Sequence, residues 1–427
     1  MSRRYKKFLL LCLASLVSAT GSGMTSFSLG VYIYQYTGRS SMTGLLLLLG
    51  FLPGLLLTPF SGVLADRHDR RLLMMTGDGL SMLGVLTVLL SISLLHGNVL
   101  ILGIGAGVAV SSAFSSLVEP AFRATVSDLL DKEEYTKASA MTQLVSSARY
   151  LLSPVLAGFL LSRWGVRAVL VLDLLTILVT LPVTYLIRRE MKQEKKSQVS
   201  CLKEELRLGL RMVYEKRGIW LLVVFGILVS FCLGTLQTLM TPMILAFADE
   251  GFLGFATTFS ACGMLAGGLF LGIVRLKKGF SRILDLSLIF IGLCMIGFSL
   301  RENRSLLCAF GFLIFAAIPF ANTSIDYLVR TNILSKHQGK VWGLIGILSQ
   351  TGYVLAYATV GSLADHIGRP LLAEEGQASS RLLGTGQGRA AALFILLAGV
   401  LLILSAAVFS RRREIKELEE EPVLKDV

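Results

Sequence analysis

The sequence has few charged residues for its length. Asp, Glu, Lys and Arg make up 16% of the 427 residues, whereas a soluble domain carries about 25%. Hydrophobic residues account for 54%, and the mean hydropathy is +0.70. This composition excludes a disordered chain, a disulfide scaffold and an ordinary soluble enzyme. It leaves a protein that crosses a membrane many times.

Residues that build metal and catalytic sites are also scarce. The six Cys and four His are scattered, and no pair has the spacing of metal ligands. No catalytic triad or ATP-binding cassette motif is present, so we expect no enzyme activity and no metal or other cofactor. In a soluble protein, the net charge of +13 would suggest a nucleic-acid partner. Here the basic residues lie between apolar runs, so we expect a lipid bilayer as the partner and no nucleic acid.

The sequence contains twelve apolar runs, each long enough to span a bilayer. Because lipid offers no hydrogen bonds to the backbone, each run should form a helix. The expected fold is therefore an all-α membrane protein with two six-helix bundles. The runs fall at roughly 8–34, 41–65, 72–95, 98–122, 138–162, 168–187, 218–247, 251–275, 281–300, 304–328, 340–364 and 389–410.

The distribution of Lys and Arg predicts the orientation of these helices. With twelve spans, both termini and the loops after every second helix share one side, which holds 32 of the basic residues. The opposite loops hold 8, and Arg149 lies inside a predicted helix. Because cytoplasmic loops are enriched in Lys and Arg, both termini should be cytoplasmic.

A charged stretch near the middle of the chain divides it into two halves. We expect an N-terminal bundle at 1–187, a cytoplasmic linker at 188–217, a C-terminal bundle at 218–410 and a charged tail at 411–427. The linker fits either a solvated spacer or a short amphipathic helix on the membrane surface. Glycines spaced by seven residues at the ends of the fifth, eighth and eleventh helices favour three-helix repeats, inverted within each half; they are Gly158 and Gly165, Gly272 and Gly279, and Gly361 and Gly368.

The loop after the second predicted helix carries the most specific motif. It reads Gly62-Val-Leu-Ala-Asp66-Arg67-His68-Asp69-Arg70-Arg71. This sequence resembles the signature cytoplasmic loop of the major facilitator superfamily, with Asp69 where the family usually has glycine. Gly62 would let two helices approach closely, and Asp66 would sit at a helix N-terminus and pair with Arg70 or Arg71. These residues, together with Arg67, form a predicted conformational latch; the alternative is a basic loop that only sets topology.

Further segments resemble the branch of this superfamily that contains bacterial macrolide-efflux and enterobactin-exporter-like proteins. They include Glu119-Pro-Ala-Phe-Arg-Ala and Ile318-Pro-Phe-Ala-Asn-Thr-Ser-Ile-Asp326. The resemblance implies an exporter of small amphipathic molecules in the bacterial plasma membrane, driven by a proton gradient. We expect the exporter to be a monomer. An importer of the same fold and a membrane sensor that does not transport remain alternatives.

The fifth predicted helix carries a second likeness to this superfamily. Ser153-Pro154-Val-Leu-Ala-Gly158 resembles a degraded form of the Gly-Pro-x-x-Gly-Gly motif of drug antiporters. Pro154 and Gly158 keep the motif residues, while Ser and Ala replace two glycines. The motif therefore gives only partial support for antiport.

Polar and aromatic residues in four of the predicted helices are candidates for contacting a substrate. In the superfamily, helices 1, 4, 7 and 10 line the central path, and a mix of hydroxyls, amides and aromatics suits a broad amphipathic substrate. Close packing by small residues is the alternative for each serine. The candidates are Tyr32, Gln35, Ser112, Phe114, Ser115, Gln237, Phe320 and Asn322.

Arg149 is the charge expected to lie deepest in the membrane. It lies about 11 residues into its run, roughly 16 Å deep at 1.5 Å per residue, and a buried cation needs an acidic partner. Glu119 is the first candidate and Asp173 the second. A carboxylate beside an arginine could take up and release a proton, although a static ion pair fits equally. Asp326 is a further candidate, but its place near a helix end also suits a cap.

Overall fold

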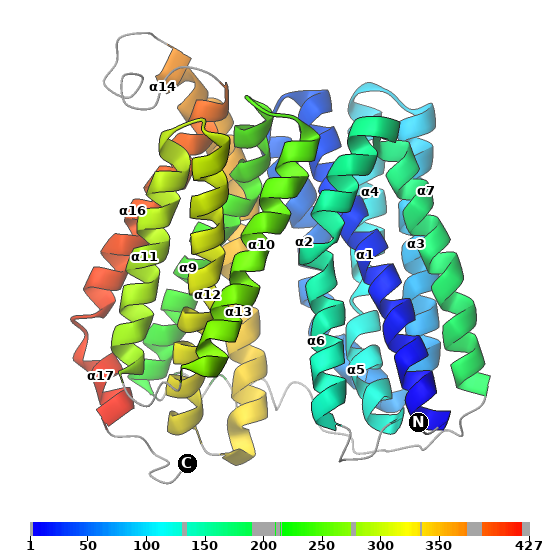
Figure 1. The fold of residues 1–427 in the computed structure, drawn as a ribbon, viewed down its shortest axis with the longest axis horizontal. Helices are drawn as coiled ribbons and strands as arrows, with labels where there is room; N and C mark the ends of the chain where they lie inside the picture. The colour runs from blue at the N-terminus through cyan, green and yellow to red at the C-terminus, as the bar shows by residue number, and fades with distance from the viewer. Residues whose placement is uncertain are drawn as a thin grey trace. The chain divides into compact units, whose positions relative to one another are not determined.

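A computed structural model describes residues 3–129, 135–189, 210, 214, 216–274, 279–333, 335–373 and 387–420. Within these ranges the regular secondary structure is helical throughout, without strands. The expected all-α fold is confirmed. In each half of the chain, long helices run side by side (Figure 1).

The described residues contain eleven helical stretches that are long and apolar enough to cross a membrane. One of them, Met141–Arg189, has 49 residues, about twice what a single span needs. Gly165 interrupts this stretch with φ 74° and ψ 178°, a conformation open to glycine and costly for other residues. The stretch therefore holds two spans, which accounts for all twelve predicted runs.

The first compact unit is built mainly from the N-terminal half of the chain. Its helices α1 and α3 both pack against α7, and they also contact α6 and α4 respectively. Phe8, Leu11 and Met74 are buried in a core cluster shared with Phe122. The helices are α1 (Arg3–Thr37), α2 (Ser40–Arg67), α3 (Arg70–Leu94), α4 (Gly97–Ser115), α5 (Val118–Leu129), α6 (Tyr135–Leu151) and α7 (Ser153–Arg189).

The second unit is built mainly from the C-terminal half. Helix α9 packs against α13 and α16, and α11 packs against α12 and α16. The helices are α9 (Arg217–Leu245), α10 (Glu250–Ile273), α11 (Phe280–Leu300), α12 (Arg304–Asn332), α13 (Ser335–Leu363), the π-helical turn η2 (Ala364–Gly368), α14 (Arg369–Ala373), α16 (Gln387–Phe409) and α17 (Arg413–Glu420).

Two helices are divided between the units by their contacts. The first turn of α2, within Arg39–Gly44, groups with unit 2, while the rest of α2 from Leu45 belongs to unit 1. Conversely, Asp249–Thr258 at the start of α10 groups with unit 1. The predicted linker at 188–217 lies mostly outside the described residues, so the predicted domain boundaries remain predictions.

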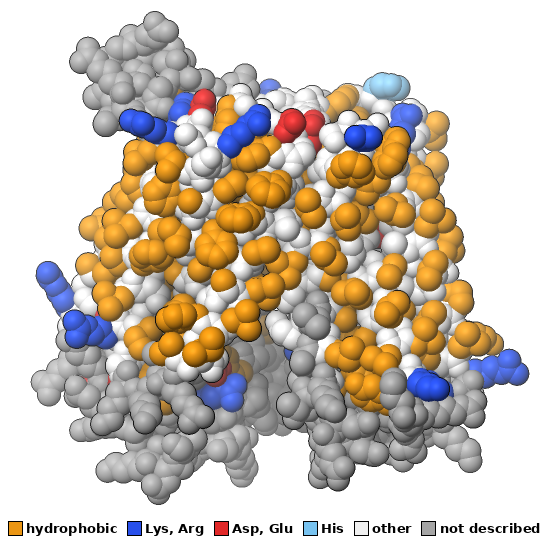
Figure 2. Space-filling model, viewed as in Figure 1, with side chains coloured by type: hydrophobic (Ala, Val, Ile, Leu, Met, Phe, Trp, Pro, Cys, Tyr) orange, Lys and Arg blue, Asp and Glu red, His pale blue; other side chains and the backbone are white. Residues whose placement is uncertain are grey.

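The outer surface of the helices is apolar. Leu13, Leu102 and Ile273 are 64%, 72% and 81% exposed, and Figure 2 shows hydrophobic side chains along the middle of the helices with charged side chains near their ends. Soluble proteins rarely expose apolar patches of this extent. This surface is suited to lipid.

Candidate functional site

Asp173 on α7 is a deeply buried carboxylate in unit 1. The residue is 1% exposed, and the hydroxyl of Thr25 on α1 donates to its Oδ2 at 2.6 Å. The hydroxyl of Thr176, one turn further along α7, lies 3.5 Å from Oδ1 of Asp173. A buried carboxylate inside a membrane-spanning helix is costly and marks a functional site by default.

Glycine on α1 makes room for this carboxylate. A Cβ added at Gly21 would lie 2.4 Å from the hydroxyl of Thr176 and 2.7 Å from Oδ1 of Asp173. Both distances are shorter than van der Waals contact allows. The absence of a side chain at Gly21 therefore lets Asp173 and Thr176 face α1 directly.

Arg149 lies beside the same part of α1. Its side chain passes Gly23, where an added Cβ would lie 3.0 Å from Cγ of Arg149, and its Nη2 is 3.5 Å from the hydroxyl of Ser26. The residue is exposed, two positions before α6 ends. Arg149 is near enough to Asp173 for their charges to interact. The structure therefore brings Arg149 near Asp173, the second of its two candidate partners.

Glu119 is not the partner of Arg149, which corrects the sequence-based ranking. It forms a 2.7 Å ion pair with Arg123 one turn along α5, and the side chains are 63% and 65% exposed. Asp326 likewise pairs with Arg330 at 2.7 Å on α12, with side chains 45% and 62% exposed. Both are i,i+4 surface pairs of a kind that contributes only about 0.5 kcal/mol.

Asp78 is a second buried acid in unit 1. It lies in α3, eight residues after the helix begins, and is 8% exposed. It is near enough to Asp173 for their charges to interact. The sequence contains a signal for this site, because Asp78 is an acid inside an apolar run. It lies seven residues after Arg71, the last residue of the basic loop.

The predicted latch loop is only partly described. The side chains of Asp66 and Arg67 fall outside the described residues. Arg70 donates to the backbone oxygen of Ala124 on α5 at 3.1 Å, and Arg71 is buried at 6% exposure. An added Cβ at Gly62 meets none of the described atoms within 4 Å, so the expected close helix approach at Gly62 is not found there.

Asp69, which departs from the family motif, has two roles in this loop. Its Oδ1 accepts the backbone N–H of Arg71 at 3.1 Å, which caps α3. Its Oδ2 accepts from Nε of Arg188 at 2.6 Å, at the far end of α7. The acid therefore links the beginning of one helix to the end of another within unit 1.

The motif of the fifth predicted helix forms a close contact with the start of α10. An added Cβ at Gly158 would lie 2.7 Å from the backbone oxygen of Glu250, and one at Gly254 would lie 2.3 Å from that of Pro154. Both pairs belong to unit 1. The two glycines let the backbones of α7 and α10 meet directly, as small residues do in membrane helix packing.

Two of the substrate candidates on α1 line a shallow cavity in unit 1. Tyr32 and Gln35 border a volume of about 350 Å³. Gln35 donates to the carboxylate of Glu250 on its rim. The other lining residues are Ile92, Leu161, Trp164, Gly165, Val166 and Arg167. Aromatic rings, one acid and one arginine suit an amphipathic molecule.

One of the three candidates on α4, Ser112, contacts α2. The hydroxyl of Ser112 donates to the backbone oxygen of Gly50 at 2.7 Å, which is a packing contact. Phe114 and Ser115 are half-buried near the end of α4. Ser112 thus follows the packing alternative.

The remaining candidates lie in unit 2. The amide oxygen of Gln237 on α9 accepts from the hydroxyl of Tyr357 on α13. The ring centroids of Phe320 on α12 and Phe270 on α10 are 6.0 Å apart. Asn322 is exposed. The described part of the chain contains no group of three or more metal-ligand residues.

The family model of the Major Facilitator Superfamily matches residues 11–356. The chain belongs to this superfamily. The suspected resemblance is confirmed, and it places the protein among multi-pass membrane transporters of small molecules rather than among enzymes.

Curated relatives support the narrower branch as well. Macrolide efflux protein A of Streptococcus pyogenes is 25% identical over 381 residues, covering 85% of this chain and 90% of the relative. The protein of the same name from Enterococcus faecalis is 27% identical over 327 residues, covering 72% and 96%. The chain is therefore similar to macrolide efflux proteins along most of their length.

Solved structures share the superfamily fold at low identity. A bacterial homologue of the human lysosomal transporter Spinster, in an inward-facing and unoccupied conformation, has a TM-score of 0.71 at 15% identity, with 100% of each chain covered. A bacterial homologue of the iron transporter ferroportin, in an inward-facing state, has a TM-score of 0.70 at 16% identity, with 96% of this chain and 100% of that one covered. These likenesses support the fold alone.

Proposed function

We propose that this superfamily member exports small amphipathic molecules of the macrolide type across the bacterial plasma membrane. The observation that carries the proposal is the similarity to macrolide efflux proteins over 90% or more of their length. The mixed aromatic and polar cavity beside Tyr32 and Gln35 supports a broad amphipathic substrate. The protein acts as a monomer, with both termini in the cytoplasm.

Export is coupled to protons that move inward in exchange. Asp173 carries the proton in this proposal, because it is the carboxylate that is buried among membrane helices with hydroxyls against both oxygens. The hydroxyl of Thr25 orients the carboxylate, and the nearby positive charge of Arg149 offsets its negative charge when the proton leaves. Asp78 adds a second acid whose charge penalises simultaneous ionisation of the two groups.

The loop after α2 acts as the cytoplasmic latch of the transport cycle. In the proposal, Asp66 faces a helix N-terminus and Arg67, Arg70 and Arg71 supply its positive neighbours. The buried position of Arg71 and the bond from Arg70 to α5 support a loop that is held against unit 1 rather than solvated. The latch holds one conformation and releases in the other.

Transport assays in a host without its own drug exporters test the proposal. Cells that produce the protein should accumulate less labelled macrolide or fluorescent dye than cells without it. The difference should disappear when a protonophore dissipates the proton gradient. Asp173→Asn should abolish the difference, whereas Asp326→Asn, which alters an exposed acid of the same type, should retain it.

Other outcomes distinguish the alternatives. Increased uptake of a solute by the producing cells would indicate an importer and contradict the proposal. Membrane insertion at normal levels without flux of any compound in a broad panel would indicate a sensor. Export that continues unchanged with the protonophore would contradict proton coupling but would still support export.

A further inference from the structure

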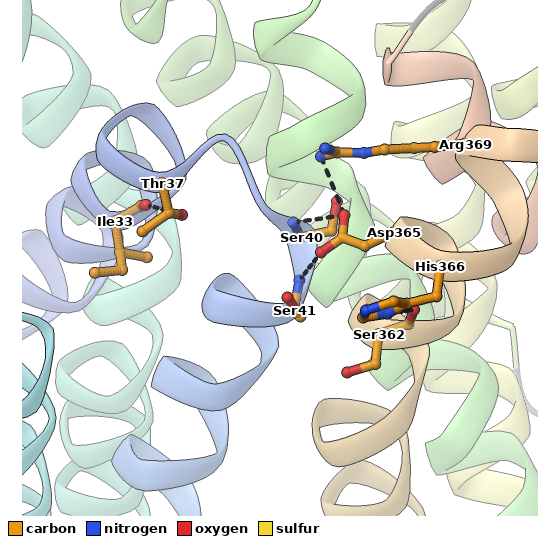
Figure 3. Close-up of polar contacts among 8 residues, drawn as sticks. All are labelled: Ile33, Thr37, Ser40, Ser41, Ser362, Asp365, His366 and Arg369. Atoms are coloured by element: carbon orange, nitrogen blue, oxygen red, sulfur yellow. Dashed lines mark hydrogen bonds and ion pairs between the residues drawn. The ribbon is translucent and has the colours of Figure 1, made fainter. Parts of the chain in front are cut away.

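The first turn of α2 is capped by a residue far away in the sequence. The backbone N–H groups of Ser40 and Ser41 donate to Oδ1 and Oδ2 of Asp365, at 3.0 and 2.8 Å (Figure 3). Arg369 reaches the same carboxylate with its Nη2 at 3.0 Å, and the Asp365 side chain is only 7% exposed. Helix N-termini normally take such a cap from the residue just before the helix.

Close backbone packing surrounds this cap. An added Cβ at Gly361 on α13 would lie 2.4 Å from the backbone oxygen of Ser40. One at Gly44 on α2 would lie 2.5 Å from the backbone oxygen of Tyr357. Glycines on both helices therefore let the start of α2 lie directly against α13. The Asp365 carboxylate binds the backbone of α2 beside this close contact.

The turn that carries Asp365 departs from the regular α-helix. Residues Ala364–Gly368 form a π-helical turn, η2, between α13 and α14. Such turns are rare and concentrate at functional sites. Here the turn places Asp365 toward α2 and Arg369, four residues on, beside the same carboxylate.

The contact joins a helix that is shared between the units. The first turn of α2 groups with unit 2, but its body from Leu45 belongs to unit 1. Since α2 is continuous, a movement of unit 1 away from unit 2 pulls this turn from Asp365. The two backbone donors would then lose the carboxylate, while Asp365 would keep its ion pair with Arg369.

We propose that Asp365, braced by Arg369, is a charge-controlled latch that binds the first turn of α2 in one half of the transport cycle and releases it in the other. By the distribution of Lys and Arg, this latch lies on the side we expect to face outward. The inference rests on alternating access between two conformations, not on the direction or substrate of the proposed function.

The start of α10 provides a matched contrast. This turn also crosses between units by its contacts, and it packs against the backbone of Pro154 and Gly158. Its cap, however, comes from its own sequence, because Oδ1 of Asp249 accepts from Phe252 N at 2.9 Å. Separation of the units leaves that cap in place. Of these two turns, the one at the start of α2 is therefore the turn whose cap comes from a distant charge.

Pulsed electron–electron distance measurements test the latch without a substrate. Spin labels at Asn98→Cys in unit 1 and Arg301→Cys in unit 2, both exposed, would report the separation of the units in a protein with its six native cysteines replaced. Asp365→Asn should raise the ratio of long to short distances by about fivefold, because losing one charged helix cap favours the conformation in which the units are apart. Asp249→Asn should leave the ratio unchanged.

Two further variants keep the test decisive. Asp365→Glu keeps a carboxylate and should give a distance distribution closer to that of the wild type than Asp365→Asn does. Arg369→Gln should shift the distribution in the same direction as Asp365→Asn. An unchanged distribution in both Asp365→Asn and Arg369→Gln would overturn the latch. An equal shift in Asp249→Asn would also overturn it, because the effect would then reflect loss of a cap in general.

Discussion

Asp69 and Arg188 join the start of α3 to the end of α7 through an ion pair of 2.6 Å. The acid is 12% exposed and the arginine 36%, so the pair is shielded from solvent more than an ordinary surface pair. The family motif usually has glycine at this position, and glycine can provide neither the cap on α3 nor the pair. The departure from the motif therefore adds a contact within unit 1.

A double-mutant cycle at this pair should reveal coupling. Asp69→Ala loses the cap and the pair and should lower the stability of the protein by about 1–2 kcal/mol. Arg188→Ala should cost less, because the cap remains. Thermal unfolding in detergent measures each variant and the double variant; strictly additive effects would show that the pair itself contributes nothing.

Gly21→Ala should damage the carboxylate site. The added methyl group would meet Thr176 and Asp173 at distances below 3 Å, and overpacking of this kind typically costs about 1–3 kcal/mol. We expect lower thermal stability and reduced export. Gly30→Ala on the same helix is the control, since a Cβ there meets no described atom within 4 Å; equal damage at both positions would argue against the packing explanation.

Glu119→Gln should leave export and its dependence on pH unchanged. The residue forms an exposed pair within α5 rather than a pair with Arg149, so its removal should cost about 0.5 kcal/mol or less. Transport measured across a pH series checks this. Loss of the pH dependence in this variant would return Glu119 to the coupling site.

Glu419→Gln should loosen the C-terminal helix α17 from unit 2. The carboxylate accepts from three backbone N–H groups at the start of α11, at 2.5, 2.9 and 3.0 Å, so its weakening should cost about 1 kcal/mol. Thermal unfolding measures the loss. Glu414→Gln is the control, because its pair with Arg217 is 3.6 Å long and the arginine is 79% exposed; a larger effect there would contradict the capping role of Glu419.

The arrangement of spans could be predicted from the sequence because hydrophobicity and the need to satisfy the backbone in lipid act locally. The twelve runs follow from the order of apolar residues along the chain, and Gly165 marks where one long helical stretch divides into two of them. The motif after α2 likewise identified the superfamily. These features depend on short segments of the chain.

The partners of charged residues could not be predicted in the same way, because they depend on which helices become neighbours. Glu119 ranked above Asp173 as the partner of Arg149, although Arg123 four residues along already offered Glu119 a local pair. The bonds from Ser40 and Ser41 to Asp365 join residues more than 300 positions apart. No local pattern contains that information.

Proton flux through the purified protein shows whether Asp173 carries the coupling proton. The protein is reconstituted in vesicles with a pH-sensitive dye inside, and an imposed gradient of a transported macrolide drives exchange. We expect a change in internal pH with the wild-type protein and none with Asp173→Asn, while Asp326→Asn should behave as wild type. Proton movement at the wild-type rate in Asp173→Asn would exclude Asp173 as the proton carrier.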